Sequence, residues 1–597
     1  GTVLFCLNPS SGVGNDWSLT GNAGTDTATN FMGTTDNMPI RFKQGNEWLG
    51  QWNKNTGNYF IGEVAGKKIT LGLDNIGIGD SALNSVTVGA RNTAIGSLAM
   101  TKTLNGTDNT TLGYNALNAG TTVLANTGIG SRALELTTTG DNNVAVGALT
   151  LSSNTIGSFN TALGTLALGS STTAIGNTAV GHESMFSNIN GNWNTALGNS
   201  TLMNNQTGAE NVAVGSDALS NNQTGSDNVA LGNAALTLSS SGSDNIAIGD
   251  SSLVNNLSSS SLIGIGSKTL HSVTASSNLI AIGDSALYSN TSAVKNIAFG
   301  NKALLSTTTG FQNIAIGHNT LEKNVAGLAN IAIGDSALPV STTNWNIAIG
   351  RFALLETTTG DKNIAIGDVA LRSNVTGANN VAIGYASQNS SNTNNRNNTS
   401  LGFRSAGGLQ GYSNTAIGGD AMGRPAASYT VNNTVAVGDS VLFNITTGAS
   451  NNTAVGTKAL YTNSSGRTNT AIGARALYDN TTGSYNVAIG DSAAANSATV
   501  SHLVAVGSKA LYTNTTGTEI TAVGDSALFS NTIGNFNTAL GNGALRKNTD
   551  GDDNAAIGNK ALYNNTTGGN NTAFGNDALY SNISGGSNTA LGFSALN

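Results

Sequence analysis

Residues 211–215 read Asn-Val-Ala-Val-Gly, and the pattern Asn-x-Ala-(Ile/Val/Leu)-Gly recurs along most of the 597-residue chain. Its closing glycine occurs 31 times between Gly79 and Gly592, and most copies follow the previous one after 17 residues. A short period repeated this often is typical of a solenoid, in which each repeat forms one coil and the coils stack. The spacing departs from 17 residues at Gly350 and in the steps between Gly384 and Gly456.

Each copy predicts a short strand with two different faces. The residue before the glycine is Ile, Val, Leu or Phe in all 31 copies, and Thr, Ile or Val stands two residues earlier in most of them. The residue between these two is always small, as Ala213 is, and it points to the opposite face. Because a face that admits only alanine must lie against a close neighbour, we expect Ala213 in a thin interior and the larger residues outside.

Two further positions of the motif carry structural information. Asn opens it in 26 of the 31 copies, including Asn92 and Asn211. An amide can donate to the coil on one side and accept from the coil on the other, which predicts an asparagine ladder along the stack. Asparagine is also a common turn-forming residue, so a turn before the strand is an alternative explanation for its recurrence. The two interpretations are compatible. The invariant glycine, as in Gly96, Gly215 and Gly249, indicates a positive φ or a place with no room for a Cβ.

A second apolar row follows the glycine. Leu or Met stands four residues after it in 28 copies, for example at Leu219, so Gly-x-x-Ala-Leu predicts a second short strand or a bend that places leucine in a continuous spine. Polar segments such as residues 221–227 then predict the turn that closes each coil. Since no 3.6-residue period is sustained, we expect an all-β parallel β-solenoid of about 31 coils of 17 residues over residues 75–597.

Residues 1–74 lack the repeat and hold three of the five tryptophans, Trp17, Trp48 and Trp52. We interpret this segment as an N-terminal cap or joining module, because a solenoid end exposes unpaired strand groups that need covering. The chain stops inside a repeat, so we also expect head-to-tail polymerisation, in which this module adds to the open coil of another copy. We interpret the irregular patch at residues 385–433 as a tolerated insertion on a polar face, with a looped-out binding patch as the alternative.

Composition limits the function. Charged residues make up 10% of the chain, the net charge is −7, and Lys and Arg are scattered, which argues against nucleic acid as a partner. No apolar run approaches the roughly 18 residues of a membrane span.

The four histidines do not cluster, the single cysteine excludes an intrachain disulfide, and no His/Cys/carboxylate set has metal-ligand spacing. We therefore expect no metal, no cofactor and no enzymatic activity. Asp follows the motif glycine in eight copies, which we interpret as solvated turn residues, with calcium ligands as the alternative.

The outward residues of the strands predict self-association. A row of Ile, Val and Leu on every coil would be a long exposed apolar stripe, which soluble monomers avoid. Burial against the same stripe of two further copies covers it symmetrically, so we predict a homotrimeric fibre. With strands about 4.8 Å apart, the 31 coils predict a length of roughly 150 Å.

The repeats Asn-Thr-Ala-Ile-Gly (92–96), Asn-Val-Ala-Val-Gly (211–215) and Asn-Thr-Ala-Leu-Gly (588–592) resemble those of trimeric autotransporter adhesin heads, the YadA-like left-handed β-roll. They also resemble long bacterial surface and phage-type tail-fibre proteins, and residues 17–25 are similar to the segment that precedes such repeats. The likeness covers residues 75–597, with a coil longer than the usual adhesin repeat. It implies a parallel homotrimer that is extracellular or at the cell surface and that binds a surface glycan or a host-matrix ligand.

The sequence therefore predicts a structural fibre for attachment or scaffolding on a cell surface or a phage-like particle. The alternative is a glycan- or ice-binding solenoid, which would use a flat face of hydroxyl groups. Here the strand reads Thr-Ala-Ile and not Thr-x-Thr, so aliphatic residues interrupt such a face. A glycan-cleaving fibre would need two carboxylates across a groove, and no such pair stands out.

Overall fold

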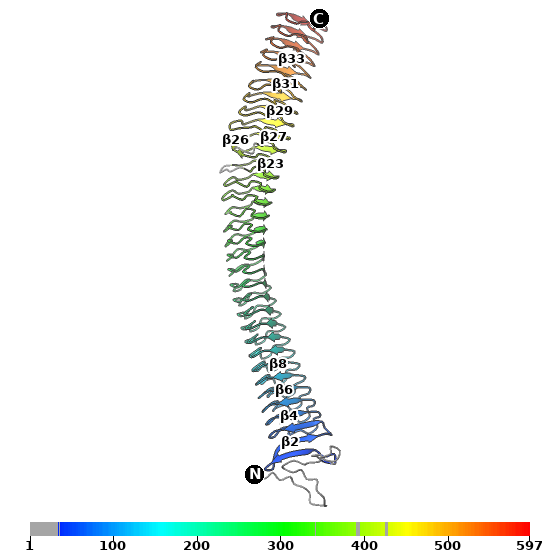
Figure 1. Ribbon diagram of the computed structural model, residues 1–597, viewed down its shortest axis with the longest axis vertical. Helices are drawn as coiled ribbons and strands as arrows, with labels where there is room; N and C mark the ends of the chain where they lie inside the picture. Colours follow the sequence, from blue (N-terminus) through cyan, green and yellow to red (C-terminus); the bar gives the residue numbers. More distant parts are fainter. Residues whose placement is uncertain (1–33, 35, 341, 390–394, 424–427) are drawn as a thin grey trace, which may run out of the picture. The chain divides into compact units, whose positions relative to one another are not determined.

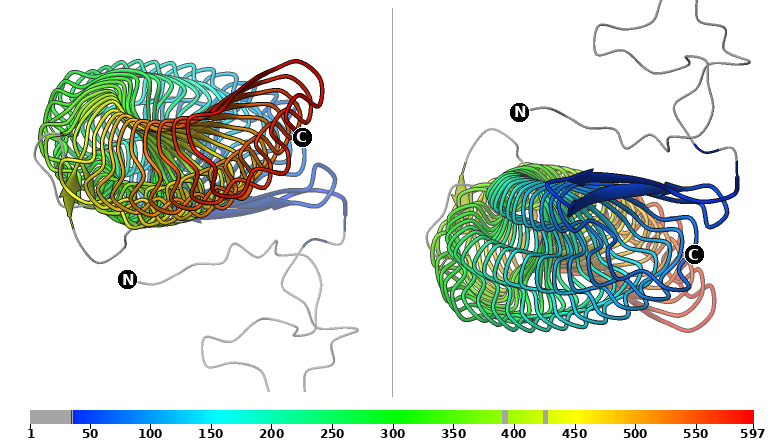
Figure 2. Two further views of the ribbon diagram at one scale, coloured as in Figure 1. Left: turned by 90° about the horizontal axis from the view of Figure 1, so that it is seen from above. Right: turned by 90° about the horizontal axis from the view of Figure 1, so that it is seen from below.

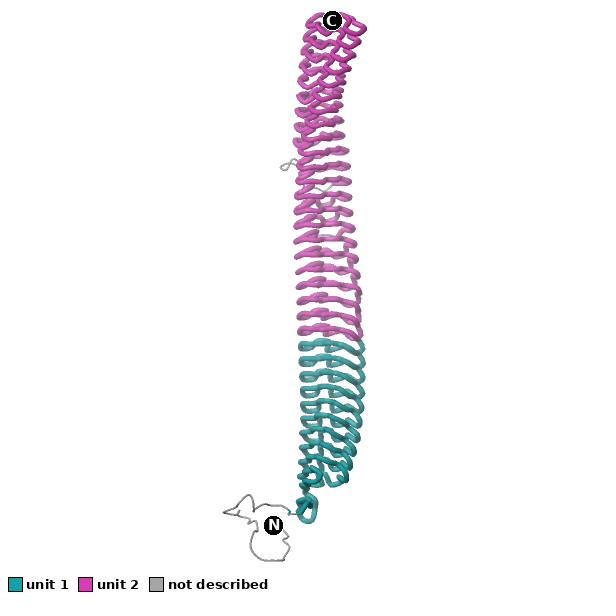
Figure 3. Tube along the Cα trace, turned by 90° about the vertical axis from the view of Figure 1, so that its right-hand side faces the viewer, with its two compact units in different colours: residues 1–225 teal, residues 226–597 magenta. Residues whose placement is uncertain are grey.

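The computed structural model describes residues 34, 36–340, 342–389, 395–423 and 428–597. The chain divides into two compact units, residues 1–225 and 226–597, which Figure 3 colours separately. In both units short strands follow one another through turns, and none of the described residues is helical. The prediction of an all-β parallel β-solenoid of about 31 turns is confirmed.

In the first unit, parallel strands stack in sequence order (Figure 1). Since the repeat returns each strand to the same place in its coil, like residues pair, as Thr178 with Thr195 and Ala179 with Ala196 do. Seen along the stack, each coil is a flattened loop (Figure 2). The strands of this unit are β1 (Ile40–Gln44), β2 (Glu47–Asn53), β3 (Asn58–Ile61), β4 (Ile76–Ile78), β5 (Thr93–Ile95), β6 (Thr110–Leu112), β7 (Thr127–Ile129), β8 (Val144–Val146), β9 (Thr161–Leu163), β10 (Thr178–Val180), β11 (Thr195–Leu197) and β12 (Val212–Val214).

The second unit repeats this plan. Its strands are β13 (Val229–Leu231), β14 (Ile246–Ile248), β15 (Leu262–Ile265), β16 (Leu279–Ile282), β17 (Ile297–Phe299), β18 (Ile314–Ile316), β19 (Ile331–Ile333), β20 (Ile347–Ile349), β21 (Ile364–Ile366), β22 (Val381–Ile383), β23 (Thr399–Leu401), β24 (Leu409–Gln410), β25 (Thr415–Ile417), β26 (Tyr429–Thr430), β27 (Val435–Val437), β28 (Thr453–Val455), β29 (Thr470–Ile472), β30 (Val487–Ile489), β31 (Val504–Val506), β32 (Thr521–Val523), β33 (Thr538–Leu540), β34 (Ala555–Ile557), β35 (Thr572–Phe574) and β36 (Thr589–Leu591). All of them belong to one parallel stack except β24 and β26, which form a separate parallel pair.

The interior is as thin as the small-residue row predicts. The middle residue of each motif strand is buried and its two neighbours are exposed or half-buried, as in β12, where Ala213 has no exposed surface. Ala218 and Leu219, in the turn after this strand, are also fully buried. The core of a typical coil therefore holds two alanines, one leucine, the motif asparagine and a buried turn residue such as Asn222, with little room for a larger side chain.

The segment after the motif glycine is a turn and not a second strand. Leu219 has a φ of 52°, in the left-handed region that L residues seldom enter. The turns nevertheless bond from coil to coil: the Leu202 amide donates to the Ala218 carbonyl at 3.0 Å, and the Asn204 amide donates to the Ser220 carbonyl at 2.9 Å. Leucine thus reaches the interior from a bend, the second of the two arrangements that the sequence predicts.

The described part of the first 74 residues contains an antiparallel meander. β1 pairs with β2 and β2 with β3 in antiparallel fashion, whereas β3 pairs in parallel with β4 and so continues the stack. Phe60 takes the inward place that alanine holds in later strands, pairs with Gly77 and is fully buried. A Cβ on Gly77 would lie 2.8 Å from the Phe60 ring, so glycine makes room for it. That this segment caps or joins copies of the chain stays a prediction.

The irregular patch at residues 385–433 varies the length of the coils without breaking the stack of strands. Successive ladder steps span 18 residues from Asn380 to Asn398, 16 to Asn414 and 20 to Thr434, yet β22, β23, β25 and β27 remain paired in parallel. The additional β24–β26 pair buries Leu409 and the Tyr429 ring. This arrangement agrees with a tolerated insertion, and a binding role stays a prediction.

The buried alanine row predicts a sharp contrast between two neighbouring positions. Ala213→Leu forces a large side chain into the filled interior and should destabilise the surrounding coils by about 1–3 kcal/mol. Ser216→Leu places the same side chain at a half-buried position that holds Phe403 in another coil, so its effect should be small. Hydrogen exchange over these coils measures both effects. Equal loss of protection in the two variants would contradict the assignment of Ala213 to the interior.

Candidate functional site: the outward face of the strands

The strands present an apolar face to the outside in both units. In the first unit its exposed members are Ile76, Ile78, Leu112, Ile129, Val144, Leu163, Leu197 and Val212. In the second unit they are Leu231, Ile297, Phe299, Ile316, Leu401, Ile472, Ile489, Leu540, Phe574 and Leu591. Phe299 and Phe574 are each 52% exposed, although large apolar side chains are normally buried. We call this surface the outward face.

The outward face is most apolar between residues 229 and 383. There, every strand from β13 to β22 carries Val, Ile, Leu or Phe at both outward positions. In β5–β7 and β9–β11 of the first unit, the first outward position is threonine instead. Ten successive strands without a polar outward residue form a patch far larger than the isolated apolar residues of an ordinary surface.

Trp52 and Tyr59 extend the outward face into the N-terminal meander. Trp52 pairs with Tyr59 and Tyr59 pairs with Ile76, so the three side chains share one face. Trp52 is 37% exposed, and its ring meets Phe42 edge-on at 5.0 Å between centroids. Trp48 is half-buried and its indole N–H donates to the Ala65 carbonyl at 2.8 Å. Trp17, the third tryptophan expected in a joining module, lies outside the described residues.

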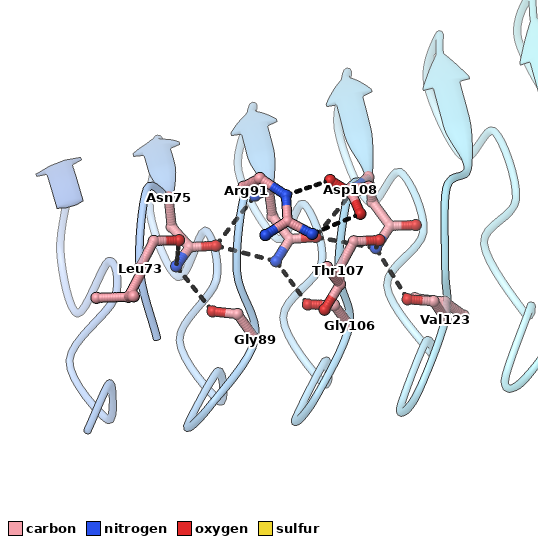
Figure 4. Close-up of polar contacts among 10 residues, drawn as sticks. Leu73, Asn75, Gly89, Arg91, Gly106, Thr107, Asp108 and Val123 are labelled. Carbon is pink, nitrogen blue, oxygen red and sulfur yellow. Dashed lines mark hydrogen bonds and ion pairs between the residues drawn. The ribbon is translucent and has the colours of Figure 1, made fainter. Parts of the chain in front are cut away.

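The asparagine ladder that the sequence predicts is present, and it holds the coils that carry the outward face in register. The Asn92 backbone N–H and side-chain amide both donate to Asn75 Oδ1, at 3.1 and 2.9 Å, and the same amide donates to the Gly106 carbonyl at 2.7 Å (Figure 4). Asn211 repeats these contacts with Asn194 at 2.9 and 3.0 Å. Because the ladder is buried, each bond fixes the height of one coil against the next without competition from water.

A second asparagine ladder runs through the turns and was not predicted. It lies seven residues after the motif glycine: Asn205 Nδ2 donates to Asn188 Oδ1 at 2.7 Å and to the Gly208 carbonyl at 2.9 Å. In the second unit, Asn531, Asn548 and Asn565 form the same ladder with bonds of 2.8–2.9 Å. The recurrence of Asn in the segment Asn-x-Thr-Gly is the signal that could have identified it.

The invariant glycine is explained by both reasons that the sequence left open. Gly96, Gly215 and Gly249 have φ values of 134°, 129° and 127°. A Cβ on Gly96 would lie 2.3 Å from the Gly113 carbonyl oxygen, and one on Gly249 would lie 2.5 Å from that of Gly266. A side chain at this position would therefore strike the backbone of the next coil.

This geometry gives a measurable prediction for Gly249→Ala. The added Cβ combines a strained φ with the contact at the Gly266 carbonyl, so the neighbouring coils should separate locally. Gly448→Ala is the matched control, because Gly448 also has a positive φ, of 96°, but a Cβ added there would meet nothing within 4 Å. Gly249→Ala should cost about 1–3 kcal/mol more than the control in hydrogen-exchange protection. If the two variants lose equal protection, the destabilisation by Gly249→Ala comes from the strained φ alone and not from the contact with the next coil.

Two hollows interrupt the surface of the second unit where aliphatic residues replace the ladder asparagine. One, of about 400 Å³, is lined by Ile263, Leu279, Ile280, Lys295 and Ile297, next to the replacements Leu262 and Leu279. The other, of about 370 Å³, is polar and is lined by Thr499, Ser501, His502, Thr516, Thr518 and Glu519, next to the replacements Leu503 and Ile520.

Charged groups are few and lie on the surface. Arg91 bonds Asp108 one coil away, with 2.6 Å between Nε and Oδ1 (Figure 4), and this hydrogen bond lowers the pKa of Asp108. Arg351 and Asp368 form a second pair at 3.0 Å. Such exposed pairs add little to stability. Within the described residues, no three His, Cys, Asp or Glu side chains are placed to hold a metal ion. The same part of the chain contains no helix long and apolar enough to cross a membrane.

The chain matches none of the known protein families with which it was compared. A search of curated proteins gives no significant match either.

Proposed function

We propose that the chain assembles as a parallel homotrimer through the outward face and serves as a structural fibre for attachment or scaffolding. The observation that carries this proposal is the uninterrupted apolar surface of β13–β22, with two outward aliphatic or aromatic residues on each strand. A surface of this kind is costly in water, and burial of one Val, Leu, Ile or Phe side chain contributes about 1.5–3 kcal/mol. Even partial burial over ten strands would outweigh the entropy lost on association.

A second copy of the same face is the partner that fits best. The face repeats at the spacing of the strands, so an identical copy in parallel offers an identical row at every height. A threefold axis brings three such faces together in a closed assembly. The resemblance of the repeats to trimeric autotransporter adhesin heads and tail-fibre proteins supports the same arrangement, a left-handed coil, and a place outside the cell or on a phage-like particle. In this proposal the chain acts without enzymatic activity.

A glycan-binding solenoid is the second candidate, and the polar hollow around His502 favours it. Four hydroxyl side chains, an imidazole and the Glu519 carboxylate meet there, which is a set of groups that hydrogen-bond sugars. The ice-binding version has less support, since the outward face alternates threonine with aliphatic residues even where threonine is most frequent. Attachment to a surface glycan through this hollow is compatible with the trimer.

Sedimentation of the purified chain tests the assembly. The proposal expects a species of three times the chain mass of 59.9 kDa, persisting on dilution. The predicted head-to-tail polymerisation would add larger species that grow with concentration. A monodisperse monomer at every concentration would refute the trimer, and glycan binding by such a monomer would leave the second candidate in its place.

A further inference from the structure

The apolar hollow of about 400 Å³ lies on the outward face itself. Ile263, Ile280 and Ile297 line it from the first outward position of β15, β16 and β17. Its other lining residues are Ser261, Asn278, Leu279 and Lys295. Each lining residue stands at or before the first outward position of its coil, so the hollow occupies the half of the face where the strands begin.

Phe299 protrudes from the other half of the same face. The position before the motif glycine holds Phe in two of the 31 copies, at Phe299 and Phe574, and a smaller aliphatic residue in the others. Phe299 ends β17, two residues after Ile297, and is 52% exposed. The outward face of β13–β22 thus carries a single phenylalanine, and this residue stands in the last of the three strands that form the hollow.

Threefold symmetry brings these two features together. Each contact in a ring of identical chains is heterologous, so the half of one face where the strands begin meets the half of the next face where they end. A rotation without translation places equal heights opposite each other, so Phe299 of one copy faces Ile297 of the next. Ile280, at the middle of the hollow, is one strand spacing of about 4.8 Å away. A phenylalanine ring directed along the stack covers that distance.

We propose that in the trimer this hollow receives the Phe299 ring of the neighbouring copy. The inference rests on the proposed trimer and names the contact that joins its copies at this height. Three isoleucine side chains would surround the ring, and an aromatic ring in an apolar pocket is the kind of contact that dominates an interface. Lys295 is exposed and has no carboxylate partner among the described residues. Its ammonium group would lie near the ring, whose faces attract cations.

The same contact would fix the register of the three chains along the fibre. The outward faces repeat at every coil, so copies shifted by one strand spacing would still match aliphatic rows with aliphatic rows. A regular face of this kind specifies its register weakly. A ring that fits one hollow removes this freedom, because a shift by several coils leaves Phe299 against a filled surface and the hollow empty.

An exchange of the two side chains tests the contact by sedimentation over a range of concentrations. Phe299→Ile leaves the hollow unfilled and should raise the concentration at which half of the trimer dissociates by about tenfold. Phe574→Ile, the matched control, shortens an equally exposed ring away from the hollow and should have a smaller effect. Ile280→Phe fills the hollow and should also weaken the trimer, whereas Ile280→Phe combined with Phe299→Ile should restore it. Each variant should fold, because these positions point away from the core of the chain.

Photo-cross-linking locates the ring directly. With p-benzoylphenylalanine in place of Phe299, irradiation of the full chain should give linked dimers and trimers on a denaturing gel. Mass spectrometry should find the attachment within residues 261–297 of another copy. A trimer whose attachment lies elsewhere, or in which the effects of Phe299→Ile and Ile280→Phe simply add, would overturn this contact and leave the trimer standing. Attachment to these residues from position 282 and not from position 299 would make Ile282 the occupant instead. A monomer at every concentration would refute both proposals.

Discussion

Asn143→Asp is expected to open the solenoid locally, although the two side chains have nearly the same shape. Asn143 Nδ2 donates to Asn126 Oδ1 at 3.1 Å and to the Gly157 carbonyl at 2.9 Å, while its Oδ1 accepts from the Asn160 backbone N–H and side-chain amide at 3.0 and 3.1 Å. A carboxylate has no hydrogen to donate, so it would face two acceptor oxygens inside a fully buried ladder. An unpaired buried charge costs about 3–5 kcal/mol.

The cost of Asn143→Asp should depend on pH in one direction. Burial raises the pKa of an aspartic acid above its ordinary value of about 3.9, because the charged form is the one that loses water. The folded variant then binds more protons than the unfolded chain between that value and the raised pKa. The deficit should be complete at neutral pH and should shrink as the pH falls towards 4.

Asn143→Leu is the matched control for the ladder prediction. It removes both the hydrogen bonds that Asn143 donates and those that it accepts from Asn160, but it introduces no charge. Leu262 and Leu503 occupy this position in other coils. Their backbone N–H groups still donate to the preceding asparagine, at 3.1 and 3.0 Å. Hydrogen exchange of the coils around residue 143 should show a smaller loss for leucine, about 1–3 kcal/mol, and no change with pH. A larger loss for leucine than for aspartate would contradict this account.

The second large effect concerns assembly. Ile314→Asp combined with Ile364→Asp places two carboxylates on the outward face, and in a trimer three copies of each would meet at the axis. Buried like charges repel and lose their hydration, so the trimer should dissociate and the sedimenting mass should fall threefold. Each chain should remain folded, because both positions point away from its own core.

Thr309→Asp combined with Thr359→Asp is the control for the assembly prediction. It adds the same charge at two exposed positions in the turns, where Asp550 stands at the corresponding place in another coil. This variant should sediment as the wild type does. A trimer that survives the two isoleucine replacements, or one that dissociates equally in both variants, would refute association through the outward face.

The strand motif carried enough information to predict the fold, because its residues act within a single coil and its nearest neighbours. Ala213, Asn92 and Gly249 each have a local reason that any copy of the repeat reveals. Leu219 does not, since its row is compatible with either a strand or a bend, and only its φ of 52° identifies the bend. A left-handed residue costs about 1–2 kcal/mol, and burial of a leucine contributes about 1.5–3 kcal/mol. The choice between a strand and a bend is therefore decided by the backbone hydrogen bonds between the turns of adjacent coils. These bonds cannot be inferred from the sequence of one repeat.

The less regular features could not be predicted for a related reason. The second ladder uses Asn in many coils and Ser, Thr or Val in others, so Asn205 resembled an ordinary turn residue. The hollows depend on the absence of an expected residue, as at Leu503. In each case the chemistry arises from what adjacent coils place side by side.

The motif ladder also has a direction. From Asn296 to Asn414 every side-chain amide bond points the same way, with Nδ2 of the later residue donating to Oδ1 of the earlier one. Aligned amide dipoles add together, as peptide dipoles do in a helix, and polarise one another. The row therefore carries partial positive charge at Asn296 and partial negative charge at Asn414, whose Oδ1 accepts from the Thr434 backbone N–H at 3.1 Å. An aliphatic residue at this position, such as Leu279, has no side-chain amide and interrupts the row of aligned dipoles. The motif ladder therefore consists of separate segments, each with its own positive and negative end.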